Sequence, residues 1–131
     1  MTDILVVDDS RVMREMVKAC LRPNSDIEVT QAASGLEAIE ALSMKRFDLV
    51  VLDLNMPDIG GIEVLEFVRG QHQLRALPII IVVTTRDDET SRATALAAGA
   101  SSYMTKPFTP EAILAEVRAL LTPGTARAAV Q

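Results

Sequence analysis

Short runs of β-branched and aliphatic residues alternate with amphipathic stretches along the chain, and this alternation limits the possible folds more than any other feature. The strand-like runs cover residues 4–7, 27–30, 49–52, 79–83 and 102–104. Between them, apolar residues recur at the spacing of a helix face. Strands that alternate with helices in this way form βαβ units with parallel strands. The sequence therefore predicts an α/β domain of strand–helix pairs around an open parallel sheet.

Residues typical of helix ends stand at the borders of the amphipathic stretches. Ser34 and Glu37 have the spacing of a capping box, and Thr109 before Pro110 has that of an N-cap followed by a proline in the first turn. Gly99 suits the position that follows a helix C-terminus. These boundary residues support the helix positions that the periodicity predicts.

The length and hydrophobic content indicate one domain. The chain has 131 residues, of which 49% are hydrophobic, and this is sufficient for a buried core. We expect the domain to occupy residues 1–121 and its last helix to cover residues 110–121. Residues 122–131 are mostly small, polar or alanine, and we expect them to form a short flexible tail.

The composition argues against several classes of function. The net charge is −5 and the basic residues form no run, so nucleic acid is not an expected ligand. No apolar stretch approaches the roughly 18 residues of a membrane span, and the N-terminus lacks the basic flank of a secretion signal. We therefore expect a cytoplasmic protein without a membrane contact. The single cysteine, Cys20, excludes an internal disulfide, and we interpret it as part of a helix core.

Charged or hydroxyl residues stand at the C-terminal ends of four of the apolar runs. They are Asp8, Asp9, Asp53, Thr84 and Lys106. Open parallel sheets bind their ligands at the carboxyl ends of the strands, so these side chains are expected to form one site. Taken singly, each has a simpler interpretation. Asp9 could equally cap the next helix, Lys106 could be a solvated surface charge, and Thr84 could be an ordinary strand-end residue.

The combination of these residue types suits phosphoryl transfer. Three carboxylates in one crevice require a cation, and Mg²⁺ is favoured because it prefers oxygen ligands and retains bound water. Lys106 and Thr84 supply hydrogen-bond donors for phosphoryl oxygens. An aspartate held beside Mg²⁺ and a lysine can be the nucleophile without a separate general base. The sequence thus predicts a Mg²⁺-dependent phosphoryl acceptor.

Four motifs together resemble the receiver domain of two-component response regulators, and the resemblance covers about residues 3–121. The motifs are Val6-Val7-Asp8-Asp9-Ser10, Leu52-Asp53-Leu54-Asn55-Met56-Pro57, Thr84 and Lys106-Pro107-Phe108. The short length and Asn55 beside Met56-Pro57 are most similar to the stand-alone receivers of chemotaxis. The resemblance implies a flavodoxin-like, doubly wound fold with five parallel strands in the order 2-1-3-4-5, flanked by five helices.

The resemblance also implies a role for each matched residue. Asp53 would accept a phosphoryl group from a sensor histidine kinase or a histidine phosphotransfer domain, with the help of Thr84 and Lys106. The implied metal ligands are Asp8, acting through water, Asp9, Asp53 and the backbone carbonyl of Asn55. Thr84 and Tyr103 would form a switch that changes the face built by the fourth helix, the fifth strand and the fifth helix. A downstream protein would bind there.

Three departures from the family pattern affect these expectations. The stretch before Thr84 is one residue longer than in chemotaxis receivers, so Thr85 is a rival for the hydroxyl role. Gly60-Gly61 replaces a common Asp-Gly pair, and we expect a looser turn there. Arg86 stands where the family controls the access of water, and it would either prolong the life of the phosphoaspartate or be a surface residue without a kinetic role.

We therefore expect a single-domain response regulator that signals by phosphorylation-dependent protein binding, as in chemotaxis. Two alternatives remain open: a phosphorelay carrier or phosphate sink, and the receiver fragment of a larger regulator. A metabolic enzyme is not expected, although the protein would assist phosphoryl transfer to its own aspartate and hydrolysis from it. An aspartyl-phosphate phosphatase would need a substrate-binding cap and a general acid, and the sequence supplies neither.

Overall fold

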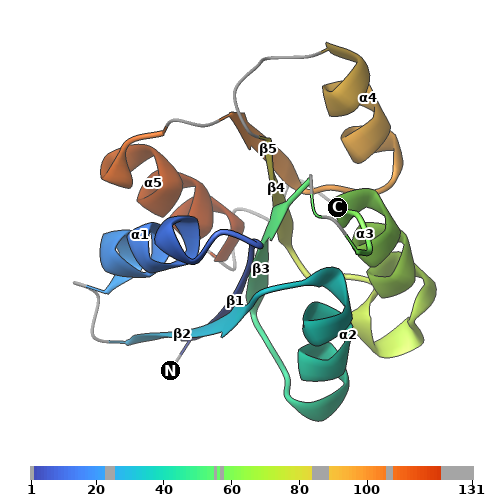
Figure 1. The fold of residues 1–131 in the computed structure, drawn as a ribbon, viewed down its shortest axis with the longest axis horizontal. Helices are drawn as coiled ribbons and strands as arrows, with labels where there is room; N and C mark the ends of the chain where they lie inside the picture. Colours follow the sequence, from blue (N-terminus) through green and yellow to red (C-terminus); the bar gives the residue numbers. More distant parts are fainter. Residues whose placement is uncertain are drawn as a thin grey trace.

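A five-stranded parallel sheet forms the centre of the computed structural model (Figure 1). The structure describes residues 2–22, 26–54, 56, 58–83, 89–105 and 108–121. The strands are β1 (Thr2–Val7), β2 (Ile27–Ala32), β3 (Leu49–Asp53), β4 (Ile79–Val83) and β5 (Ser102–Thr105). They lie in the order β2-β1-β3-β4-β5, and each neighbouring pair is parallel. The α/β class with a parallel sheet, predicted from the alternating pattern, is confirmed.

Helices cover both faces of this sheet. They are α1 (Arg11–Leu21), α2 (Gly35–Met44), α3 (Gly61–Gly70), α4 (Glu89–Ala97) and α5 (Pro110–Leu121), with a short 3₁₀ helix, η1 (His72–Leu74). Figure 1 shows α1 and α5 on one face and α2, α3 and α4 on the other. The fold is therefore doubly wound. None of the helices in the described ranges is long and apolar enough to span a membrane.

The two faces of the sheet carry separate apolar layers. Toward α1 and α5, the buried residues are Ile4, Val6, Val17, Leu21, Leu49, Val51, Ile113 and Val117. Toward the other helices, β1 and β3 contribute Leu5, Val7, Val50 and Leu52. Successive strand residues point to opposite faces, so a central strand must be apolar throughout. This explains the uninterrupted apolar runs of the sequence. Cys20 is partly buried against the α1/α5 layer, and burial raises the pKa of its thiol.

The helix boundaries follow the predicted capping residues with one difference. The Ser34 hydroxyl accepts a hydrogen bond from the Glu37 N–H at 3.1 Å, but the Glu37 carboxylate accepts from the Ala33 N–H at 2.9 Å. The second bond of the expected capping box is thus displaced by one residue. The Thr109 hydroxyl caps α5. Gly99 ends α4 with a φ of 110°, a conformation that side-chain-bearing residues rarely adopt.

Arg69, near the end of α3, connects three segments of the chain through its guanidinium. Nε and Nη2 donate to the Gly99 carbonyl oxygen at 2.9 and 2.7 Å. Nη1 donates to the carbonyl oxygens of Arg75 and Leu77 at 3.0 and 2.7 Å. These bonds satisfy carbonyl groups of the segments that lead into β4 and β5. Arg69 therefore holds the segments before the N-terminal ends of β4 and β5 against α3.

Arg69→Met is expected to lower the free energy of unfolding by about 2 kcal/mol, because partly buried carbonyl groups lose a charged donor. Methionine retains the apolar stem, so the loss is mainly that of the hydrogen bonds. Urea titration measures the change. Arg75→Met is the control, because the Arg75 side chain is exposed and the residue contributes only its backbone carbonyl to the contact. Equal stabilities of the two variants would contradict this role.

Candidate functional site

Three aspartates meet at the carboxyl edge of the sheet. Asp53 is the last residue of β3, and Asp8 and Asp9 directly follow β1, the neighbouring strand. One carboxylate oxygen from each lies within 4.8 Å of the others. Asp8 and Asp53 are only 6% and 2% exposed, whereas Asp9 is exposed. The convergence predicted for these three residues is therefore present in the structure.

The backbone and the carboxylate of Asp8 are both held in place. Its N–H donates to the Ala32 carbonyl oxygen at 3.2 Å, and its Oδ1 accepts from the Ser10 N–H at 2.9 Å. The Asp8 carbonyl oxygen accepts from Nη1 of Arg14 at 2.7 Å. Ser10 also caps α1 through its hydroxyl, which accepts from the Met13 N–H. The helix cap is thus Ser10 rather than Asp9, which leaves Asp9 available for another role.

The donor set fits a hard divalent cation. Carboxylates that are this close repel one another, and burial of two of them raises the cost of their charges. A cation with oxygen ligands relieves both effects, and Mg²⁺ typically binds through one or two carboxylates together with water and phosphate oxygens. The three aspartates could therefore hold Mg²⁺. The exposed side of Asp9 leaves the cluster accessible from solvent.

Several predicted site residues lie outside the described ranges. They are Asn55, Thr84, Thr85, Arg86 and Lys106. The strands that precede Thr84 and Lys106 are described, and β4 and β5 end at Val83 and Thr105, which are register partners. Val82 in β4 is the partner of Asp53. The ends of β3, β4 and β5 thus lie at the same edge of the sheet.

Tyr103, the predicted switch aromatic, lies in β5 and is partly buried against the apolar layer on the face of the sheet that α2, α3 and α4 cover. The guanidinium carbon of Arg92 in α4 lies 5.9 Å from the centroid of the Tyr103 ring, within the range of a cation–π contact. Tyr103 therefore connects β5 to α4. A rotation of its ring would change the contact between these two elements.

The backbone at Gly60 and Gly61 is held by hydrogen bonds, and Gly61 packs closely against the end of β3. Whether this turn is looser than one with an Asp-Gly pair stays a prediction. The Gly61 N–H donates to the Leu54 carbonyl oxygen at 3.0 Å, and the Gly60 N–H donates to Oε1 of Glu63 at 2.9 Å. A Cβ atom on Gly61 would lie 2.5 Å from the Asp53 carbonyl oxygen. The glycine is required because the helix begins directly against the strand end that carries Asp53.

Asp58 links the same turn to α2, a contact that the sequence analysis missed. Its carboxylate accepts hydrogen bonds from the N–H groups of Gly35 and Leu36 at 3.3 and 3.2 Å. Desolvation opposes the charged form, but bonds from these and neighbouring backbone N–H groups outweigh it and lower the pKa of Asp58. Asp58 therefore remains an ionised cap at the α2 N-terminus. An aspartate two residues before a glycine pair was the only signal of this contact.

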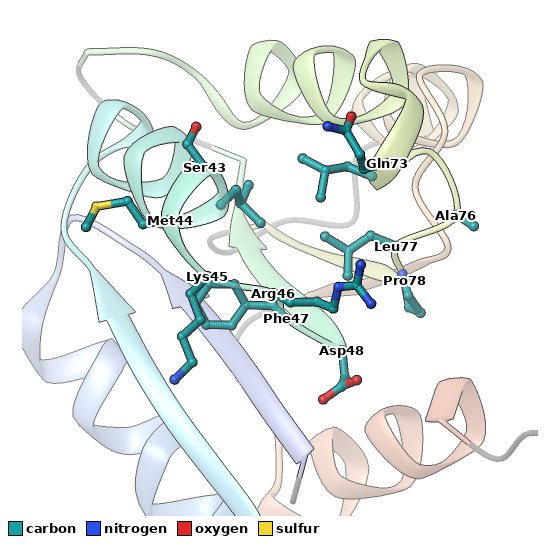
Figure 2. Close-up of a pocket in the computed structure, with 12 residues that line it drawn as sticks. Ser43, Met44, Lys45, Arg46, Phe47, Asp48, Gln73, Ala76, Leu77 and Pro78 are labelled. Carbon is teal, nitrogen blue, oxygen red and sulfur yellow. The ribbon is translucent and has the colours of Figure 1, made fainter.

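A cavity in the described part of the chain lies away from the aspartates. It has a volume of about 770 Å³ and opens where β3 and β4 begin, at the edge of the sheet opposite the acidic cluster (Figure 2). Residues of the segments before β3 and β4 line it, including Arg46, Phe47 and Pro78. Lys45, also at its wall, is paired with Asp3 at 3.1 Å. The cavity is therefore separate from the candidate site.

Comparison with known proteins identifies the family. A family profile described as "Response regulator receiver domain" matches residues 4–118. The chain therefore belongs to the receiver domain family of response regulators in two-component systems. This assignment agrees with the resemblance found in the motifs and with the position of the aspartates at the sheet edge.

The similar proteins differ in how much of their own length the match covers. The response regulator MprA of Mycobacterium tuberculosis is 43% identical over 118 residues, which are 90% of this chain and 50% of MprA. The probable transcriptional regulatory protein TcrX of the same species is 40% identical over 90% of this chain and 49% of TcrX. The chain thus spans about half the length of these curated relatives. The structure of chemotaxis protein CheY4 of Vibrio cholerae is similar with a TM-score of 0.85 and 36% identity, covering 92% of this chain and 99% of CheY4.

Proposed function

We propose that the chain is a phosphorylation-dependent signalling domain in which Asp53 accepts a phosphoryl group. The most direct support is the position of Asp53 beside Asp8 and Asp9. One carboxylate oxygen from each lies within 4.8 Å of the others, in a chain of the receiver family. Asp53 is almost fully buried at the end of a central strand, so its position is fixed by the core beneath it.

The reaction needs no catalytic histidine within this chain. A carboxylate oxygen of Asp53 attacks phosphorus, the bond from phosphorus to the donor's histidine nitrogen breaks, and an acyl phosphate forms. The leaving imidazole retains the bonding electrons and takes a proton from solvent. A bound Mg²⁺ would neutralise the carboxylates and the phosphoryl oxygens. Asp8, Asp9 and Asp53, with the Asn55 carbonyl, are the proposed ligands. Thr84 and Lys106 are proposed to contact the phosphoryl oxygens.

The proposed donor is a sensor histidine kinase or a histidine phosphotransfer domain. We propose that residues 1–121 form the receiver, that residues 122–131 form a tail, and that Tyr103 transmits the change. Its contact with Arg92 supports an output surface that includes α4 and β5. Output by protein binding, as in chemotaxis, is supported by the match to nearly the whole length of CheY4. The receiver of a longer transcriptional regulator is the second candidate, favoured by relatives such as TcrX that are twice as long.

Incubation with a small-molecule phosphodonor tests the proposal. We expect intact mass spectrometry to detect one added phosphoryl group in the presence of Mg²⁺ and none after chelation with EDTA. The metal is required because the carboxylates would otherwise repel the anionic donor. Transfer from a phosphorylated histidine kinase should show the same metal dependence. If the mass stays unchanged with both donors at saturating Mg²⁺, the proposed function is contradicted.

A further inference from the structure

A relay of side-chain hydrogen bonds extends from the acidic cluster to the surface between α1 and β2. Arg14 donates through Nη1 to the Asp8 carbonyl oxygen at 2.7 Å and through Nε to Oε1 of Gln31 at 2.9 Å. Gln31 in turn donates through Nε2 to Oε2 of Glu15 at 2.7 Å. The relay therefore begins at the backbone of one aspartate of the candidate site and ends at an exposed carboxylate.

The first bond of the relay is made to a carbonyl group at the end of the sheet. The ladders of β1 with β2 and β3 both end at Val7, so the Asp8 carbonyl lies beyond the last register pair. Arg14 reaches back from the first turns of α1 and supplies a donor to it. Together with the bonds to Ala32 and from Ser10, this contact fixes the turn that carries Asp8 and Asp9.

The hydrogen bonds from Arg14 to Gln31 and from Gln31 to Glu15 fix the orientation of the Arg14 guanidinium. The Gln31 amide has a defined orientation, because its oxygen faces a guanidinium and its nitrogen faces a carboxylate. The hydrogen bond from Gln31 is the main cause that lowers the pKa of Glu15, so the acceptor stays ionised at neutral pH. A planar guanidinium can bond Asp8 and Gln31 at once, whereas the single ammonium of lysine lacks this rigid fork.

We propose that Arg14 is a positioning residue for the metal site. It holds the turn of Asp8 and Asp9 in the metal-binding geometry before the cation arrives, so less rearrangement accompanies binding. This inference rests on the proposed function. Residues that orient metal ligands typically change metal affinity by tenfold or more when they are lost. Loss of Arg14 should therefore weaken Mg²⁺ binding without slowing phosphoryl transfer once the site is filled.

The sign of the effect separates positioning from simple electrostatics. Removing a positive charge near a cation site strengthens cation binding if only charge matters. If Arg14 positions the turn, Arg14→Met instead weakens Mg²⁺ binding, by roughly tenfold. Arg11→Met is the matched control, because Arg11 lies in the same helix, is exposed and has no hydrogen bond to the turn among the described residues. It should bind Mg²⁺ as tightly as the wild type or slightly more tightly.

The test measures Mg²⁺ affinity by titration calorimetry and, separately, the dependence of phosphorylation rate on Mg²⁺ concentration. For Arg14→Met, we expect a weaker Kd, a higher half-saturating Mg²⁺ concentration, and a wild-type rate at saturation. Gln31→Leu retains the charge of Arg14 and removes its second bond, so it should shift Kd in the same direction by a smaller factor. This variant also tests the inference if Arg14→Met folds poorly.

The outcomes distinguish this inference from the proposed function. Unchanged or tighter Mg²⁺ binding by both variants, with a wild type that binds Mg²⁺ and is phosphorylated, would overturn the positioning role alone. A rate that stays low in Arg14→Met at saturating Mg²⁺ would also overturn it, because Arg14 would then act on the chemistry. A wild type that neither binds Mg²⁺ nor gains a phosphoryl group would overturn the proposed function, and the positioning role with it.

Discussion

Asp53→Asn is expected to abolish phosphorylation of the chain by small-molecule donors and by a phosphorylated histidine kinase. An amide lacks the anionic oxygen that attacks phosphorus, while it keeps nearly the same shape as the carboxylate. The substitution also removes one of the two buried carboxylates that the described residues bring to this edge, so the folded state loses like-charge repulsion. We therefore expect complete loss of the mass increase together with an unfolding temperature at or above that of the wild type.

Asp48→Asn is the control for this experiment. Asp48 is exposed at the opposite edge of the sheet, where its Oδ2 accepts a hydrogen bond from the Asp3 N–H at 2.8 Å. Asparagine can accept the same bond, so the variant should fold normally and gain the same mass as the wild type. A phosphoryl group that persists on Asp53→Asn would place the acceptor elsewhere in the chain. Fragmentation of the phosphorylated wild type would then locate it.

The contrast between Asp53 and Arg14 shows what could be predicted from the sequence. The aspartates follow strand-like runs, and parallel strands bring their carboxyl ends to one edge, so periodicity alone brings Asp8, Asp9 and Asp53 together. The bond from Arg14 to Gln31 joins residues on a helix and on an edge strand, and it depends on side-chain directions that no periodicity encodes. The fold and the acidic cluster were therefore predictable, and the residues that support the cluster were not.

The close packing of Gly61 was not predictable for a similar reason. A glycine pair in a sequence is compatible either with a flexible turn or with a close approach of two backbone segments. The structure shows the second case, because the N-terminus of α3 packs against the end of β3. The assignments to Thr84 and Lys106 stay predictions. They rest on motif spacing, and phosphorylation of the corresponding variants is needed to test them.

The glycines at the two ends of α3 are expected to respond to alanine in opposite directions. A Cβ atom at Gly61 would lie 2.5 Å from the Asp53 carbonyl oxygen and 2.8 Å from the Leu54 Cα atom, and both are backbone atoms that cannot rotate away. Gly61→Ala must therefore push α3 away from the strand end. We expect a loss of about 3 kcal/mol in the free energy of unfolding, at the upper end of the usual cost of overpacking.

Gly70 provides the matched comparison within the same helix. A Cβ atom there meets nothing within 4 Å, and its φ is not positive. Gly70→Ala should therefore gain about 0.5 kcal/mol, because alanine restricts the unfolded chain more than glycine does. Urea titrations of both variants, with Mg²⁺ titrations of the folded proteins, measure the two effects. Gly61→Ala should also bind Mg²⁺ more weakly, since the added Cβ atom presses on the backbone of Asp53, whereas Gly70→Ala should bind it normally. Equal stabilities would show that the β3–α3 turn can relax without cost, and that Asp53 is not fixed by the start of α3.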